Sequence, residues 1–158
     1  MEIKQKHTLL VLAFALTLFS ACDKEDKNRR KTAGLYDLEK YEVKYYTSGN
    51  LDSTYNSENL GTIGLYDNDS RIYNNTTDNW PGYPKGWIDN GLGGAIGWYP
   101  DEGKNKTLTF FSEDANGFIA YAIYNVEKTG RNKFTWTYVA TDVNGAFLYV
   151  EKLFMKKQ

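Results

Sequence analysis

The residue types that most often carry out chemistry in proteins are scarce in this chain. It has 158 residues but only one histidine, His7, and one cysteine, Cys22. From residue 23 onward there is neither an imidazole nor a thiol. This composition excludes from residues 23–158 histidine acid–base catalysis, Ser-His and Cys-His nucleophiles and ordinary zinc sites. The sequence therefore predicts a protein that is not an enzyme and holds no cofactor and no metal.

Carboxylates are the main acid–base groups that remain. Two adjacent pairs, Asp101-Glu102 and Glu113-Asp114, fall near expected turns. A glycosidase needs two carboxyl groups that face one cleft, roughly 5 to 10 Å apart, whereas these positions indicate solvated turn residues. The acidic segments that begin at Asp67 and Asp142 lack the glycine that a calcium loop needs at its sixth position. Plain turns are predicted in both places.

The N-terminal segment has the pattern of a secretion signal. Lys4 and Lys6 precede an apolar run over residues 9–19 that only Thr17 interrupts. At about 1.5 Å per residue such a run crosses roughly half of a bilayer core, which favours a cleaved signal over a membrane-spanning helix. The small residues just before Cys22 resemble the bacterial lipoprotein signal, which implies that Cys22 is lipidated.

A charged segment without any apolar side chain follows, over residues 23–31. Such a composition predicts a solvated tether. Its Lys24-Glu25-Asp26 triplet resembles the export signal of Bacteroidetes surface lipoproteins, although a charged linker can contain the triplet by chance. The resemblance implies a lipid-anchored protein at the outer membrane, exposed on the cell surface. We therefore divide the chain into a signal peptide (1–21), a lipidated cysteine with a charged tether (22–33) and a folded domain (34–158).

The charge of the remaining chain limits its partners. Residues 1–21 contain two lysines and one glutamate, so their removal changes the net charge from −1 to −2. Without a basic excess, nucleic acid is not expected as a partner. All 13 tyrosines and all 4 tryptophans lie beyond residue 21, and these side chains combine large apolar area with a polar edge.

Alternation of period two dominates from residue 35 onward. Tyr41, Val43 and Tyr45 share one face of an expected strand, and similar alternation recurs over residues 134–140 and 147–155. Tyr36 and Leu38 are out of phase with this set, which predicts a bulge or a separate turn near residues 39–40.

Turn signals separate these strands, and no convincing helix is expected after the signal. Glycine follows a small polar residue at Ser48-Gly49, Asn116-Gly117 and Asn144-Gly145, as tight hairpins require. Residues 118–126 are apolar on both faces, which predicts a strand buried on each side. The fold class is therefore all-β, an antiparallel up-and-down meander of about eight strands that closes into a barrel.

Several short motifs resemble one family. They are Tyr36-Asp37-Leu38, Gly97-Trp98-Tyr99, Leu108-Thr109-Phe110, Phe134-Thr135-Trp136-Thr137 and the closing segment 149–153. In this order they are similar to the lipocalin-like lipoproteins of Bacteroidetes, over residues 35–157. The resemblance implies a calycin-type β-barrel of about eight strands.

Aromatic residues form the predicted ligand site. Residues 74–90 form a long segment without periodicity, and such loops are often functional. The predicted contacts are three loop residues and three strand residues: Trp80, Tyr83, Trp87, Trp98, Trp136 and Tyr138. The alternative is that strand aromatics such as Trp136 and Phe110 fill the interior, because an eight-stranded barrel has room for side chains or one small ligand.

The predicted function follows from these features. We expect an envelope lipoprotein whose barrel domain binds a small apolar or glycan ligand without catalysis. Aromatic faces beside Asp89 and Asn90 would suit sugar rings. The alternative is an interaction module, or an accessory subunit of an outer-membrane complex, whose partners are other envelope proteins.

Overall fold

The computed structural model describes residues 27–66, 72–76, 84–93, 96–101 and 106–158. The chain divides into two units, residues 1–32 and 33–158. In the first unit residues 27–32 are helical, so the prediction of no helix after the signal is wrong there. Lys and Arg, which are good helix formers, make up most of this short segment. No helix in the described part of the chain is long and apolar enough to cross a membrane.

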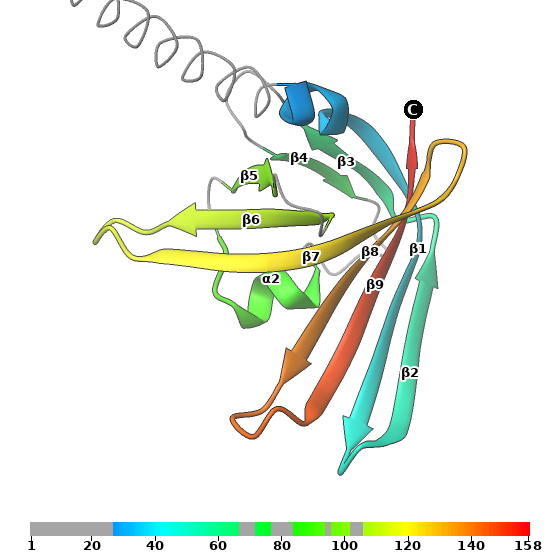
Figure 1. The fold of residues 1–158 in the computed structure, drawn as a ribbon, viewed down its shortest axis with the longest axis vertical. Coiled ribbons are helices and arrows are strands. Elements are labelled where there is room, and N and C mark those ends of the chain that lie inside the picture. The colour runs from blue at the N-terminus through cyan, green and yellow to red at the C-terminus, as the bar shows by residue number, and fades with distance from the viewer. Residues whose placement is uncertain (1–26, 67–71, 77–83, 94–95, 102–105) are drawn as a thin grey trace, which may run out of the picture. The chain divides into compact units, whose positions relative to one another are not determined.

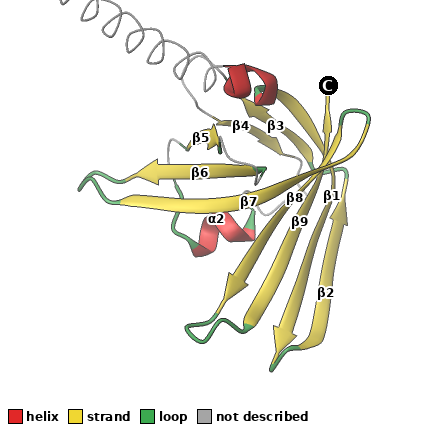
Figure 2. Cartoon of the chain, viewed as in Figure 1, coloured by secondary structure: helices red, strands yellow, loops and turns green. Residues whose placement is uncertain are grey.

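Residues 33–158 form a single antiparallel sheet (Figures 1 and 2). Its strands are β1 (Gly34–Thr47), β2 (Asn50–Glu58), β3 (Gly61–Leu65), β4 (Ile72–Thr76), β5 (Gly97–Pro100), β6 (Thr107–Glu113), β7 (Ile119–Gly130), β8 (Lys133–Thr141) and β9 (Phe147–Lys157). The strand order is β4-β3-β1-β9-β8-β7-β6-β5, with β2 also paired to β1. The prediction of an all-β antiparallel meander is confirmed.

Strand β1 carries the predicted bulge. Its register against β9 shifts between Leu38 and Lys40. Because of this shift Tyr36 and Leu38 are buried together with Tyr41 and Val43, although the two pairs differ in phase along the sequence. Of the two predicted alternatives near residues 39–40, a bulge or a separate turn, the register shift supports the bulge.

The edge of β1 that does not pair with β9 is shared by β2 and β3, which follow β1 in the chain. The chain between these two strands turns at Asn59 and Gly61, where φ is 56° and 110°. Positive φ is also found at the predicted hairpins, with 80° at Gly49, 79° at Gly117 and 82° at Gly145. Glycine adopts this conformation without steric cost, which explains these turns.

Aromatic rings pack together in the core on the inner face of the sheet. The ring of Phe110 lies 4.8 Å from Trp87, 5.5 Å from Tyr124 and 5.8 Å from Trp136, measured between centroids. Trp136 also contacts Tyr36 at 5.2 Å. The core therefore joins β1, β6, β7 and β8 to a short helix at residues 85–89.

Strand β7 is not buried on both faces, contrary to the prediction. Its inward residues Ala122 and Tyr124 are buried, but Ile119, Tyr121 and Ile123 are 43%, 53% and 55% exposed. The apolar character of both faces misled the prediction. In the described residues no element covers the outer face of this strand.

The two end strands of the sheet are β4 and β5. The described residues contain no backbone pairing between these strands, so hydrogen bonds do not close the sheet into a barrel. One side chain bridges the gap, because the buried indole of Trp98 on β5 donates a hydrogen bond of 3.1 Å to the carbonyl of Tyr66, which follows β3.

Strands β7 and β8 separate along their length. Residues Asn125 to Gly130 of β7 pair with β8, whereas the first half of β7 diverges from β8 (Figure 1). The helix α2 (Lys85–Asp89) contacts both strands. The prediction of no helix in this segment is therefore wrong, and the helix is held by the burial of Trp87 rather than by favourable helix composition.

Candidate functional site

The inner face of β2, β1, β9 and β8 carries tyrosines around one acidic residue. The strand register places Tyr55, Val43, Glu151 and Tyr138 in one row across the four strands. The next row holds Ser53, Tyr45, Tyr149 and Ala140. Tyr41 on β1 and Tyr124 on β7 flank these rows. We call Tyr41, Tyr45, Tyr55, Tyr124, Tyr138 and Tyr149 the tyrosine face.

The rings of the tyrosine face lie close to one another. Centroid distances are 5.5 Å for Tyr124 and Tyr138, 6.0 Å for Tyr138 and Tyr149, and 6.1 Å for Tyr149 and Tyr45. Tyr55 lies 6.1 Å from Tyr41 and is 46% exposed. The face thus begins in the core and continues to an exposed aromatic ring.

Glu151 lies at the centre of this face with no exposed surface. Its Oε2 accepts a hydrogen bond of 2.6 Å from the backbone N–H of Gly86, and its Oε1 accepts one of 2.8 Å from the hydroxyl of Tyr124. The hydroxyl of Tyr41 is a third donor to this carboxylate and itself accepts a hydrogen bond from the amide of Lys85. A buried carboxylate needs such partners, because an unpaired one would be costly.

Burial raises the pKa of Glu151 to about 7, and the negative charge of Asp89 adds to the increase. The three hydrogen-bond donors have the opposite effect and lower the pKa. Burial also raises the pKa of Tyr41, Tyr124 and Tyr149, and the charge of Glu151 contributes to each increase. These three tyrosines therefore stay neutral where Glu151 titrates.

Helix α2 makes further polar contacts with the tyrosine face. The amide of Asn90, the residue after the helix, donates to the hydroxyl of Tyr138 at 2.7 Å and to the carbonyl of Gly86 at 2.6 Å. The ammonium of Lys85 lies 4.8 Å from the ring centroid of Tyr149 and pairs with Asp89 at 3.0 Å. The helix therefore covers part of the face and adds charged groups at its rim.

The residues predicted to bind a ligand have different locations. Trp80 and Tyr83 lie outside the described residues. Trp87, Trp98 and Trp136 are 0%, 0% and 1% exposed, and each packs in the core. Only Tyr138, which is half-buried, belongs to the tyrosine face. As ligand contacts these residues remain a prediction.

Sequence reasoning missed Glu151 and all five of the other tyrosines as parts of one site. The alternation of Tyr149, Glu151, Leu153 and Met155 does place Glu151 on the apolar side of its strand. That inward carboxylate is the signal that could have revealed the site. Its partners come from β1, β7 and α2, and no local pattern links these segments.

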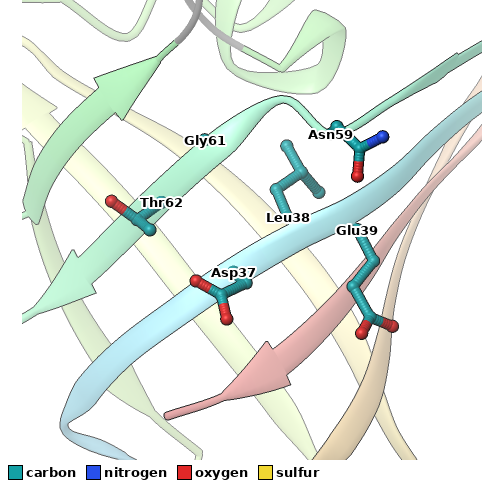
Figure 3. Close-up of a pocket in the computed structure, with 6 residues that line it drawn as sticks. All are labelled: Asp37, Leu38, Glu39, Asn59, Gly61 and Thr62. Carbon is teal, nitrogen blue, oxygen red and sulfur yellow. The ribbon is translucent and has the colours of Figure 1, made fainter.

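An open hollow of about 420 Å³ lies elsewhere, where the chain turns between β2 and β3 (Figure 3). It is lined by Asp37, Leu38, Glu39, Asn59, Gly61 and Thr62. Both of its carboxylates already have partners, because Asp37 accepts from Gln158 at 2.7 Å and Glu39 pairs with Lys133 at 3.0 Å. We therefore prefer the tyrosine face as the candidate site.

Metal chemistry receives no support from the described residues, which contain no group of three metal-ligating side chains. Comparisons with protein-family models, with curated proteins and with solved structures found no match to this chain.

Proposed function

We propose that the domain is a non-enzymatic binding module and that the tyrosine face binds a glycan. One observation carries the proposal: the tyrosine face runs from the buried Glu151 to the exposed ring of Tyr55 on the same side of the sheet. Tyrosine rings offer flat apolar surface with a hydroxyl at the edge, which matches the alternating apolar and hydroxyl surfaces of sugars.

The packing of the interior favours a glycan over an apolar ligand. The ring of Phe110 contacts the rings of Trp87 and Trp136. Each of these three side chains is at most 1% exposed. The tyrosine face is polar at its rim instead, because Lys85 lies over the ring of Tyr149 and pairs with Asp89. A ligand that uses both ring faces and hydrogen bonds fits this face best.

The proposal also includes a cellular location. We infer that the domain is attached to the outer membrane through a lipid on Cys22 and displayed on the cell surface, as a lipocalin-like lipoprotein would be. The signal-like run before Cys22 and the Lys24-Glu25-Asp26 triplet support this inference. A surface position would bring the tyrosine face into contact with extracellular glycans.

A binding experiment tests the ligand class. The full chain in detergent is titrated by calorimetry with a panel of oligosaccharides and, separately, with fatty acids. We expect saturable binding of an oligosaccharide that weakens about fivefold in Tyr55→Ala and in Tyr45→Ala, since a lost aromatic contact costs about 1 kcal/mol. Tyr121→Ala, which removes a similarly exposed ring from the outer face of β7, is the control and should bind normally.

Two results would contradict the proposal. Saturable fatty acid binding that is lost in the same two variants would keep the site but overturn the ligand class. Oligosaccharide binding that is unchanged in both variants would place the site elsewhere.

A second candidate function rests on a different surface. The outer face of β5, β6 and β7 carries Tyr99, Phe111, Ile119, Tyr121 and Ile123, which we call the outer apolar surface. Phe111 lies opposite Tyr121 and its ring is 5.9 Å from that of Tyr99. Exposed apolar surface of this kind is typical of protein-binding sites, so it favours the role of an interaction module in an envelope complex.

In-cell crosslinking tests this role. A photo-crosslinking residue at position 121 should capture one defined envelope protein, and the same residue at position 54 of β2 should not. Purified partner should then bind the wild-type chain but not Ile123→Lys. Absence of a specific adduct at position 121 would rule out the outer apolar surface as the interface.

A further inference from the structure

Strand β2 has one edge that no backbone partner covers in the described residues. The strand pairs with β1 alone, and Figure 1 shows it at the margin of the sheet with β1 on one side only. We propose that the free edge of β2 binds the same edge of a second copy of this chain, so that two sheets join across a two-fold axis. Any enlargement of the glycan site by this pairing rests on the proposed function, but the pairing itself does not.

The free edge offers backbone hydrogen-bonding groups. Successive residues of a strand direct their N–H and C=O groups to opposite edges. Residues 53–58 pair with residues 40–45 of β1 in regular register, and all of them except Ser57 are exposed. About half of the backbone groups in this stretch therefore point away from β1 and remain available to another strand.

The features that commonly prevent edge pairing are few in this stretch. Proteins protect exposed edges with charged side chains, proline, bulges or very short strands. Residues 53–57 contain no charged residue and no proline, and the bulge of β2 lies just before them, at Asp52. Strand β5 differs, because it has four residues and ends at Pro100. Strand β2 is therefore better suited to pairing than β5.

The sequence of this edge favours a second copy over an unrelated strand. Residues 53–57 read Ser-Thr-Tyr-Asn-Ser, which is nearly the same in both directions. A two-fold contact requires such self-complementarity, because each contact between two different residues occurs twice, once on either side of the axis. The antiparallel arrangement of two such strands satisfies this condition.

One register uses the whole of this stretch. An antiparallel pair centred on Tyr55 places Ser53 opposite Ser57 of the second copy and Thr54 opposite Asn56 of the second copy. Both are polar pairs that can form cross-strand hydrogen bonds. The ring of Tyr55, which is 46% exposed, then lies opposite its counterpart on the axis. The pairing therefore joins the tyrosine faces of the two copies at their exposed ends.

Acidic residues limit the length of the paired stretch. In this register Asp52 of one copy faces Glu58 of the other, just beyond either end of residues 53–57. Like charges directly opposite one another are unfavourable in a sheet. We therefore expect added salt to tighten the dimer, and Glu58→Gln to tighten it about threefold.

Charge substitutions at positions 54 and 56 test the pairing. Two double variants, Thr54→Glu with Asn56→Glu and Thr54→Lys with Asn56→Lys, each place like charges opposite one another across the axis. Within one chain these positions lie opposite Lys44 and Glu42 of β1. Each variant therefore gains one favourable and one unfavourable neighbour in its own chain, and both should fold like the wild type.

Sedimentation of the full chain in detergent, without glycan, measures association up to about 1 mM, since so short an interface is expected to be weak. The wild type should dimerise. Each double variant alone should dimerise about tenfold more weakly, and an equimolar mixture of the two should dimerise more tightly than the wild type, because opposite charges then meet. Val143→Glu and Val143→Lys, at the fully exposed tip of the β8–β9 turn, are the control and should sediment like the wild type alone or mixed.

Three outcomes would overturn the dimer. They are a monomeric wild type over this range, self-association of both double variants equal to that of the wild type, and a mixture that associates no better than either variant. A monomeric wild type would leave the edge to a strand of a different protein. With the photo-crosslinking residue at position 54, the dimer predicts an adduct of the chain with itself alone. Because no glycan is present, failure of the dimer is distinct from failure of the proposed ligand class.

Discussion

The backbone amide of Gly86 lies 2.6 Å from Oε2 of Glu151, and this contact joins α2 to β9 across 65 positions of the chain. A side chain at position 86 would occupy the space that the tyrosines use. A Cβ there would lie 2.7 Å from the hydroxyl of Tyr124 and 2.9 Å from the ring of Tyr138. Glycine is therefore the residue that lets the helix approach the carboxylate closely enough to donate.

Gly86→Ala should displace α2 from the tyrosine face. Overpacking of this kind costs about 1 to 3 kcal/mol, so we expect the free energy of unfolding, measured in urea, to fall by that amount. Gly93→Ala is the matched control, because a Cβ at position 93 meets nothing within 4 Å. Equal stability of the two variants would contradict the close packing of α2 on β7 and β8.

Glu151→Gln should change how stability depends on pH. The folded pKa of about 7 lies above the ordinary value of 4.5, so the protonated group stabilises the fold in acid and this stability is lost as pH rises through that interval. At about 1.4 kcal/mol per pKa unit the wild type should lose about 3 kcal/mol there, and Glu151→Gln should lose much less.

Other carboxylates act in a different pH window. Backbone N–H groups in the hairpin turns lower the pKa of Asp114 and of Asp142, so their contribution is present above their ordinary pKa and is lost only in stronger acid. Urea unfolding at several pH values therefore separates the two effects. Parallel stability curves for wild type and Glu151→Gln would show that Glu151 is not the group responsible.

Trp98→Phe should loosen the contact between the two ends of the sheet. It removes the donor to the carbonyl of Tyr66, and a lost hydrogen bond costs about 1 kcal/mol, to which the smaller ring adds a packing loss. We expect faster amide exchange in β5 and at residues 61–66. Trp136→Phe, which removes the same atoms from another buried ring, should destabilise the protein without this local effect.

Cys22→Ser should abolish lipid attachment and processing. The wild-type chain, expressed in a bacterium with lipoprotein processing, should yield a mature protein that begins at residue 22 and carries a lipid, as intact mass spectrometry would show. The variant should keep residues 1–21 and remain unmodified. Ser20→Ala, which keeps a small residue before the cysteine, should be processed normally, and a lipid-free wild-type protein would refute the lipoprotein assignment.

Much of the sheet could be predicted from local patterns because each pattern expresses a local constraint. The phase change between Leu38 and Tyr41 indicated a bulge, and the positive φ of the hairpin turns favours glycine there. Alternation of period two sorts residues between two faces of a strand, since successive side chains point in opposite directions. The same alternation does not say whether another element covers a face, which is why the exposed outer face of β7 was predicted as buried.

The sequence by itself therefore determined the fold class, the positions of the hairpins and the bulge, and the absence of histidine and cysteine chemistry beyond residue 22. Only the tertiary structure decided that Glu151 is buried among Tyr41, Tyr124 and Gly86, that residues 85–89 form a helix, and that Trp98 bridges sheet ends that backbone pairing leaves open. The physical reason is that hairpins and bulges depend on the backbone preferences of a few neighbouring residues. The burial and ionisation of Glu151 depend instead on the register of four strands and on the docking of α2, which bring distant segments into contact.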